Sequence, residues 1–251
     1  MKRPLLILLL FCILSQFSEA QLWKLKRFEA SAGLGPTFFF GDVGGYSNGE
    51  NILGLKDVTF KQTRINFDLS VKYRLTQAIN ARFSFSYGLL NATDIRGSNE
   101  GREYEASMNY FQPALIGEYY FIKNKSENSY IFVSSGRRFF RTLFSSLDFY
   151  AFTGIGGMGY TVEGNEALEN NPKGFESGGF TAVLPLGVGT TLIYSPYLNF
   201  GLEFGGRYTF TDYLDGYTSQ YSSHNDVYYF LNFVVTYKLK TGRNGLPAFR
   251  R

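Results

Sequence analysis

Cysteine, histidine and long apolar runs are all scarce in this chain of 251 residues. Cys12 is the only cysteine and His224 the only histidine. Without a second cysteine the chain forms no internal disulfide and no cysteine-based metal site. Beyond the first twenty residues, no apolar run approaches the roughly 18 residues that suggest a membrane-spanning helix. The formal net charge is only +4, without the concentrated basic face of a nucleic-acid binder.

Residues 1–20 have the three parts of a secretory signal peptide. Lys2 and Arg3 give a basic start, residues 5–14 are apolar but too short to span a bilayer, and Ala20 ends a small-residue cleavage site. The mature chain is therefore expected to begin at Gln21 and to lack Cys12. A lipoprotein anchor at Cys12 is disfavoured because the preceding residue is a bulky phenylalanine.

Aromatic residues and glycine are abundant in this exported chain. The sequence holds 26 Phe, 19 Tyr and 28 Gly, and 18% of its residues are aromatic. An exported, aromatic-rich and glycine-rich chain without helical spans has the profile of an outer-membrane β-barrel. The alternative is a secreted β-sandwich, whose strands are usually shorter.

Residues 198–211 show the pattern from which the rest of the chain is interpreted. Even positions such as Leu202 and Phe204 are apolar, whereas odd positions such as Glu203 and Arg207 are small or polar. Successive strand side chains point to opposite faces, so the segment has one apolar and one polar face. It exceeds the usual strand length of about 5–6 residues and reaches the roughly 9–11 that a tilted membrane strand needs. Charges opposite the apolar face suit the polar lumen of a transmembrane barrel.

Seven further segments show a strand pattern, which gives eight strands in all. They are residues 28–40, 64–75, 79–89, 109–121, 147–160, 180–194 and 227–239. The fifth is glycine-rich with ambiguous facing, and Pro113 in the fourth is expected at a bulge because it lacks a ladder donor. An even strand number fits a single-chain bacterial barrel. The prediction is one all-β domain over residues 21–251: an eight-stranded antiparallel transmembrane barrel in the outer membrane, with a basic tail at 240–251.

Charged residues recur on the inward faces of these predicted strands. They are Arg64, Asp68, Lys72, Arg82, Glu118, Glu203 and Arg207. Eight strands leave an interior just wide enough for side chains to fill, so a salt-bridged plug is favoured over an open pore. Glu203 and Arg207 are expected to pair across strands with residues such as Glu118 or Arg82.

Three motifs with possible chemistry have simpler structural interpretations. Residues 154–159 fit a dinucleotide-binding glycine pattern, but no helix signal follows them. Residues 222–226 combine serines, His224 and an acid, yet neighbours on one loop do not make a catalytic triad. Asp212 and Asp215 are interpreted as turn caps. The sequence therefore predicts no catalytic, cofactor-binding or metal-binding residue, and a non-enzymatic protein; a lipid-modifying barrel enzyme and a small-solute pore remain the alternatives.

The stretch from Thr211 to Gly216 carries a family resemblance, together with residues 201–203 and Arg207, and with residues 185–189 and 40–42 in support. It reads Thr211, Asp212, Tyr213, Leu214, Asp215 and Gly216. In it the chain resembles a Bacteroidetes outer-membrane barrel family typified by the PorG subunit of the type IX secretion system. The resemblance implies an accessory outer-membrane subunit that contacts periplasmic components of the secretion machine.

Strand parity puts residues 122–146 and the basic tail on the same side as the N-terminus, which is the periplasm in such barrels. A connection of that length is unusual where turns are normally short. Its basic and aromatic residues are candidates for docking an acidic periplasmic partner: Arg137, Arg138, Phe139, Phe140 and Arg141. The alternative is a plug or flap that covers the lower mouth of the barrel.

Overall fold

The computed structural model describes residues 26–44, 61–95, 100–123, 146–218, 225–242 and 246–248. The predicted signal peptide, most of the 122–146 connection and His224 lie outside these residues. In chain order the described elements are β1 (Phe28–Phe40), β2 (Arg64–Arg74), β3 (Ile79–Thr93), η3 (Glu100–Arg102), β4 (Glu105–Ile122), β5 (Leu147–Gly164), α3 (Glu166–Glu169), β6 (Gly178–Ile193), β7 (Leu198–Thr209), β8 (Val227–Thr241) and β9 (Pro247–Ala248).

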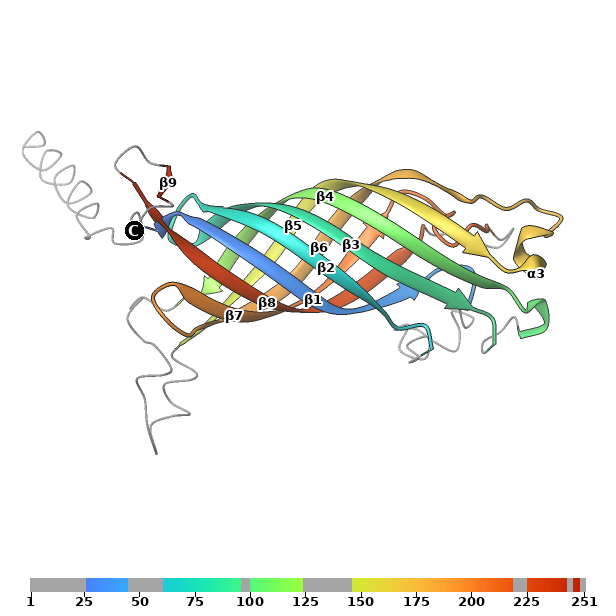
Figure 1. Ribbon diagram of the computed structural model, residues 1–251, viewed down its shortest axis with the longest axis horizontal. Helices are drawn as coiled ribbons and strands as arrows, with labels where there is room; N and C mark the ends of the chain where they lie inside the picture. The colour runs from blue at the N-terminus through green and yellow to red at the C-terminus, as the bar shows by residue number, and fades with distance from the viewer. Residues whose placement is uncertain are drawn as a thin grey trace, which may run out of the picture.

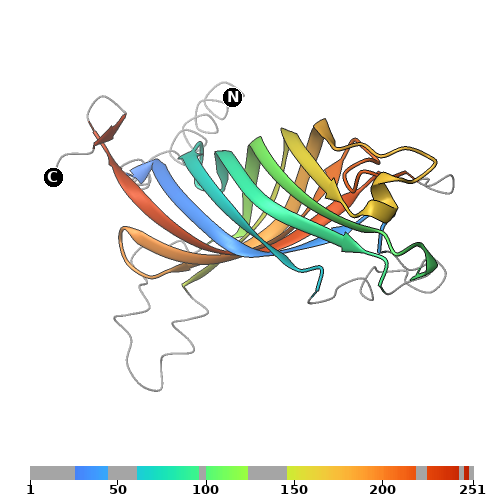
Figure 2. The same cartoon turned by 45° about the vertical axis from the view of Figure 1, so that its right-hand side comes forward.

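Strands β1 to β8 form a closed antiparallel barrel. Each strand pairs with the next one in the sequence, and β1 closes the sheet by pairing with β8. The strands run obliquely around a long axis (Figures 1 and 2). Closure leaves none of these eight strands with an unpaired edge. The predicted eight-stranded barrel is confirmed, and β9 is an addition that pairs only with the end of β8.

The outer face of the barrel is apolar through its middle. Large hydrophobic side chains on every strand point away from the lumen and are exposed; examples are Leu34, Leu69, Phe85, Leu115, Ile155, Leu186, Phe204 and Phe233. A protein in water does not expose such a continuous apolar band, whereas a membrane barrel turns it to lipid. Within the described part of the chain, no helix has the length and apolar character to cross a bilayer.

The two ends of the barrel differ in their connections. The links from β2 to β3 and from β6 to β7 are short, and they lie at the same end as the start of β1 and the end of β8. Short turns and chain termini mark the periplasmic end of outer-membrane barrels, so the opposite end is extracellular. Figure 1 shows β9 at the periplasmic end and α3 at the extracellular end.

Several strands reach further than the sequence pattern indicates. β3 continues to Thr93, β4 begins at Glu105 and β5 ends at Gly164, whereas β7 stops at Thr209, two residues before the predicted end. The added parts of β3, β4 and β5 form one extension at the extracellular end, because they pair with one another in register.

The extension was missed because its alternation is inverted. Leu90, Met108 and Val162 point inward and are buried, while Ser107 and Thr161 face outward. Above the membrane the outer face meets water, so apolar side chains move to the inside without any change of register. A search for apolar-outward segments therefore assigned these residues to loops.

The prediction of a bulge at Pro113 is wrong. Pairing between β4 and β5 skips from Phe111↔Gly159 to Ala114↔Gly156 and keeps the same register, and the recorded shift in this pair lies between Tyr120 and Ile122. The missing proline donor thus leaves only a gap in the ladder. Pro36 and Pro185 lie at equivalent gaps, in the β1–β8 and β5–β6 pairs.

Candidate functional site

The centre of the lumen holds a cluster of four charged side chains that we call the lumen cluster. It consists of Lys72 on β2, Arg82 on β3, Glu118 on β4 and Glu203 on β7, and all four are buried. Lys72 and Arg82 are cross-strand partners, so the two cations lie side by side. Strand alternation places all four on the inner face, as the sequence pattern predicts.

Ion pairs in this cluster cross the lumen. Arg82 Nη1 lies 2.6 Å from Glu203 Oε1 and 3.2 Å from Glu118 Oε1, while Lys72 Nζ lies 2.8 Å from Glu118 Oε1 and 3.8 Å from Glu203 Oε1. Because β3 and β7 are not neighbours in the barrel, the contact between Arg82 and Glu203 spans its interior. Each cation contacts both carboxylates, so the cluster blocks the lumen at this level.

Neutral side chains complete the coordination of the two carboxylates. The Tyr150 hydroxyl donates a hydrogen bond to Glu203 Oε1 at 2.5 Å, and Asn80 Nδ2 donates to Glu118 Oε2 at 3.1 Å. Buried carboxylates need such partners, because an unmet charge in a low-dielectric interior is costly. Tyr150 was not predicted, since it lies on the glycine-rich strand whose facing is ambiguous in the sequence.

A second ion pair fills the lumen closer to the periplasm. Arg74 Nη2 lies 3.0 Å from Glu29 Oε1, and both side chains are buried. The sequence places both residues on inward faces but gives no sign that they pair. Glu29 and Arg74 lie on adjacent strands. Arg74 is two residues beyond Lys72, the direct cross-strand partner of Glu29, and an arginine side chain reaches such a diagonal neighbour.

Three of the seven predicted network residues lie outside the lumen cluster. Asp68 accepts a hydrogen bond from the Ser86 hydroxyl at 2.7 Å, and no ion pair of Asp68 is found among the described residues. Arg64, at the extracellular start of β2, is half-buried and donates from Nη1 to the carbonyl oxygens of Lys61 and Thr63. It does not belong to a lumen network.

Arg207 is the clearest departure from the expected pairing. Its guanidinium lies 4.3 Å from the centre of the Phe230 ring, and within the described chain no carboxylate forms an ion pair with it. A cation above an aromatic face is attracted by the ring quadrupole. Glu203 thus pairs with Arg82 as expected, whereas Arg207 pairs with neither Glu118 nor another acid.

The family motif forms part of the extracellular cap of the barrel, which we define as residues 41–44 and 211–218 with the strand ends that they cover. Asp215 Oδ2 accepts a hydrogen bond from Val43 N at 2.9 Å, and its Oδ1 accepts from Tyr217 N at 3.1 Å. Asp226 Oδ2 accepts from Leu214 N at 2.8 Å. Asp215 thus ties the loop after β7 to the residues after β1, and Asp226 ties the same loop to the start of β8. The bond from Tyr217 N, two residues on, agrees with the interpretation of Asp215 as a turn cap.

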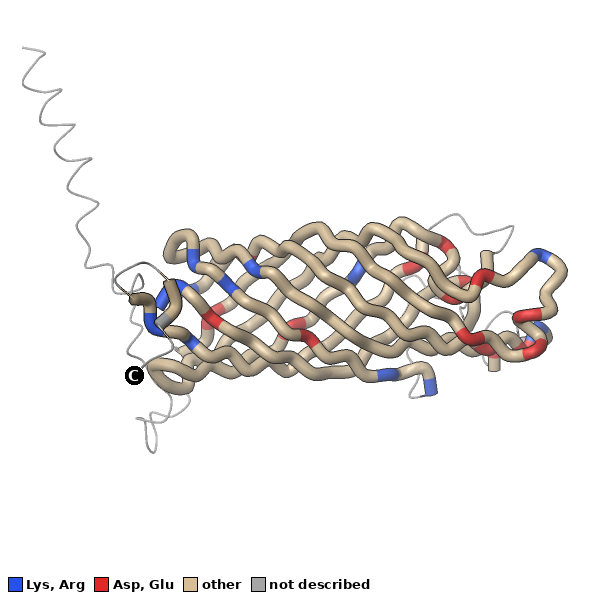
Figure 3. Tube along the Cα trace, turned by 45° about the horizontal axis from the view of Figure 1, so that its top comes forward, with Lys and Arg blue, Asp and Glu red and all other residues tan. Residues whose placement is uncertain are grey.

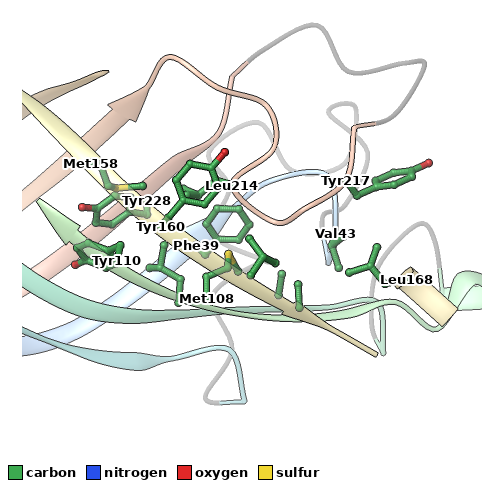
Figure 4. Packing of buried hydrophobic residues seen from close by; sticks show 14 of the residues in the cluster. Phe39, Val43, Met108, Tyr110, Met158, Tyr160, Leu168, Leu214, Tyr217 and Tyr228 are labelled. Atoms are coloured by element: carbon green, nitrogen blue, oxygen red, sulfur yellow. The ribbon is translucent and has the colours of Figure 1, made fainter. Parts of the chain in front are cut away.

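Apolar side chains fill the space below the cap. The cluster includes Phe39, Met108, Met158, Tyr160, Leu168 and Leu214, all buried, and Figure 4 shows them converging from β1, β4, β5 and the loops. Gly216 has a φ of 77°, a left-handed conformation that favours glycine and lets the chain turn back after Asp215. Among the described residues, a hydrophobic core therefore lies inside the extracellular end of the barrel.

Two cap carboxyls have raised pKa values. Burial is the main cause for both: it raises the pKa of Asp215 to about 7, and Asp42 and Asp212 nearby add to the effect. The pKa of Asp226 is raised well above its usual range by burial and by the charge of Asp215. A third acid, Asp94, is instead paired with Arg102 Nε at 2.9 Å and accepts from Gly44 N at 2.7 Å.

The described residues contain no cluster of three or more His, Cys, Asp or Glu side chains that could hold a metal ion. Of the serine, histidine and acid group at 222–226, only Asp226 has a described side chain, and its carboxylate is engaged with the Leu214 amide. Arg137, Arg138, Phe139, Phe140 and Arg141 lie outside the described residues.

The two ends of the described barrel differ in charge. Around the extracellular end the exposed acids outnumber the exposed lysines, Lys61 and Lys173; the acids are Glu103, Glu105, Glu163, Glu166, Glu169 and Glu176. At the periplasmic end the described cations outside the lumen are Lys26, Arg27, Lys123 and Lys240, and both described acids there, Glu29 and Asp148, are buried. In Figure 3, Asp and Glu gather around the extracellular end with a few Lys and Arg among them, whereas Lys and Arg predominate at the periplasmic end.

A closed eight-stranded barrel with an apolar outer band and a polar, side-chain-filled lumen defines an outer-membrane β-barrel protein. The chain is therefore an integral protein of the outer membrane.

No family model matches the chain, and no curated protein matches it. Several solved structures do match the chain. Neisserial surface protein A (NspA) is 14% identical, with a TM-score of 0.45, over 84% of this chain and 96% of that chain. A major outer membrane protein from Thermus thermophilus is 12% identical, with a TM-score of 0.46, over 84% and 98%. Ail of Yersinia pestis is 12% identical, with a TM-score of 0.42, over 85% and 97%. The likeness is one of fold.

Proposed function

We propose that this barrel is a non-enzymatic, structural subunit of type IX protein secretion machinery and that it contacts periplasmic components of that machinery. The observation that carries the structural part of the proposal is the filled lumen. Arg82 and Glu203 meet across the interior, and a hydrophobic core lies between them and the extracellular mouth. A barrel whose described lumen is filled in this way is expected to act through its ends and its outer face.

The assignment to type IX secretion rests on the resemblance of residues 211–216. In the structure these residues hold the cap: Asp215 and Leu214 take part in hydrogen bonds that join two loops. A motif used in this way preserves the shape of the extracellular end.

The periplasmic end supports a contact with an acidic partner. Lys240 is exposed there, and Lys26, Arg27 and Lys123 are half-buried around the same rim. Charge of one sign at a rim steers a partner of the opposite sign and raises the association rate. Residues 124–145, which include the predicted docking side chains, connect β4 to β5 at this end.

The test is co-purification from native membranes in mild detergent, together with secretion assays on a strain that lacks the gene. We expect the protein to bring down periplasmic components of the secretion machine, and secretion to fail without it. Deletion of residues 124–141 is expected to abolish both the co-purification and the secretion while leaving a membrane-inserted barrel.

Deletion of residues 46–59, from the extracellular end, is the matched control, and it should leave both readouts intact. Normal secretion in the strain without the gene would overturn the proposed role. Unchanged co-purification after deletion of residues 124–141 would overturn docking through that segment.

A further inference from the structure

A groove of about 330 Å³ lies on the outer face of the barrel, across strands β3 to β6. Four of its lining residues form one cross-strand row, with the partners Tyr87↔Phe111, Phe111↔Gly159 and Gly159↔Phe180. The side chains of Tyr87, Phe111 and Phe180 are 52%, 49% and 74% exposed, so the groove opens away from the lumen.

Gly157 and Gly159 shape this groove because glycine has no side chain. A Cβ at Gly159 would lie 2.4 Å from two atoms of the Phe111 ring, and a Cβ at Gly157 would lie 2.5 Å from the Phe180 ring. Each ring therefore leans over bare backbone that any other residue would cover. The two aromatic rings form the walls of the groove, and Gly159 forms part of its floor.

The groove lies at the upper edge of the apolar band. Asn109 and Thr161 face each other across β4 and β5, one outward position above Phe111 and Gly159, and both line the groove. The next outward pair above them is Ser107↔Glu163. The groove thus has an apolar body within the hydrocarbon and a polar rim at the level of the outer-leaflet headgroups.

We propose that this groove binds one acyl chain of a lipopolysaccharide molecule in the outer leaflet, with the linkage between chain and sugar held at Asn109 and Thr161. The groove is continuous with the lipid-facing surface, where hydrocarbon and not water is available to fill it. The aromatic walls supply contact area along the chain.

The rim favours an acylated sugar over a phosphate group. Asn109 and Thr161 offer an amide and a hydroxyl, which match the amide, ester and hydroxyl groups of an acylated sugar. Neither side chain has a hydrogen-bond partner among the described residues. The described part of the groove lining contains no basic side chain, and the neighbouring Glu163 is exposed and repels a phosphate.

The experiment is a native mass spectrometry titration of the folded, full mature chain in detergent, with purified lipid A and, separately, with phosphatidylethanolamine. Wild-type protein is expected to retain one lipid A molecule with higher affinity than phosphatidylethanolamine. Gly159→Val adds a side chain at the groove floor and forces the Phe111 ring to shift, so it is expected to weaken lipid A binding at least about tenfold. Asn109→Leu keeps the apolar body but removes a rim group, and it should weaken lipid A binding to a smaller extent.

Gly206→Val is the matched control. Gly206 also faces outward beside an aromatic ring, with its ideal Cβ 3.1 Å from Tyr229, but it lies on β7, away from the groove. The Gly206→Val protein should bind lipid A with the affinity of the wild type. Folding of each variant is checked by the heat-dependent shift in gel mobility, and Asn109→Leu serves if Gly159→Val does not fold.

Three results would overturn the proposal. Equal lipid A binding by wild type, Gly159→Val and Asn109→Leu would show that the groove is not the site. Equal affinity for phosphatidylethanolamine would remove the assignment to lipopolysaccharide. A dimer of this chain that Gly159→Val dissolves would show that a second copy, and not a lipid, fills the groove.

Discussion

The membrane-spanning part of this barrel and the extension above it are built from the same strands with opposite patterns. On β3, Arg82 points inward and Phe85 outward in the membrane, whereas Leu90 points inward above it. On β4 the same reversal separates Glu118 from Met108. The strand alternation is unbroken, so what changes is the solvent on the outside.

This comparison explains how one lumen contains two kinds of core. Where lipid covers the outer face, the charged residues lie inside, and the four of the lumen cluster pair with one another beside an apolar cluster that includes Ile116 and Phe152. Where water covers the outer face, the interior is packed like that of a soluble protein. The apolar core begins below the groove rim, because it includes Met158 and Val183 as well as the residues above Asn109 and Thr161.

The largest expected loss of stability comes from a substitution in the lumen cluster. Glu203→Gln removes a carboxylate that contacts Arg82, Lys72 and Tyr150, so it leaves buried cations short of a partner. The free energy of unfolding is expected to fall by about 3–5 kcal/mol. Urea unfolding of the barrel in lipid vesicles measures it.

Arg207→Gln is the control for this prediction. Arg207 is as buried as Glu203 but contacts an aromatic ring instead of an acid, so its loss breaks no ion pair. Its cost should be clearly smaller than that of Glu203→Gln. Equal losses from the two variants would contradict the view that ion pairing stabilises the lumen.

Substitution of two leucines tests the hydrophobic core below the cap. Leu90→Ala opens a cavity in the core below the cap, and it should lower the free energy of unfolding by about 2–5 kcal/mol. Leu69→Ala, on the lipid-facing side of β2, should cost less because lipid fills the vacated space. If Leu69→Ala proved the more costly change, the extension would not contain a packed core.

A third comparison concerns the outer face, within the apolar band and above it. Phe204→Arg places a charge in the apolar band and should cost about 2–4 kcal/mol near the bilayer midplane. Ser107→Arg introduces the same side chain on the same face above the band, and it should change the folding free energy very little. Folding yield into lipid vesicles distinguishes the two, and a similar yield for both would place the membrane boundary elsewhere.

The smallest effect concerns the pH dependence of the cap. Because burial raises the pKa of Asp215 to about 7, the folded cap holds a proton that the unfolded chain releases at lower pH. The stability of the cap is therefore highest below the ordinary carboxyl pKa of about 4 and falls as the pH rises to about 7. The protection factors of the Val43 and Tyr217 amides, which correct for the intrinsic pH dependence of hydrogen exchange, should fall over this range.

Asp215→Asn should flatten this pH dependence, because the asparagine carbonyl still accepts one hydrogen bond but does not ionise. Leu214→Ala is the comparison, since it should weaken the cap by a similar amount at every pH. A wild-type cap that becomes more stable with rising pH would have the opposite sign and would contradict the raised pKa.

The facing of the membrane strands could be predicted from the sequence, because a period of two is set by backbone geometry. The extension could not be found in the same way, since Leu90, Met108 and Val162 continue the alternation with reversed polarity. A pattern search that allows the polarity to invert along one strand would have found it.

It was easier to predict which residues lie in the lumen than to predict which of them contact one another. Alternation assigns Arg82, Glu203 and Arg207 to one face, but it does not give their heights along the barrel axis. Arg82 and Glu203 meet from strands that are not neighbours, whereas Arg207 lies level with Phe230. Such contacts depend on strand tilt and stagger, which a single strand pattern does not contain.

The most direct test of a filled lumen is single-channel recording of the purified mature chain in planar lipid bilayers. The ion pairs across the interior and the core below the cap predict no stable conductance steps at neutral pH. The inserted protein is verified in parallel by its heat-dependent gel mobility. Steady, reproducible conductance steps from folded wild-type protein would contradict the account and make a small-solute pore the better description.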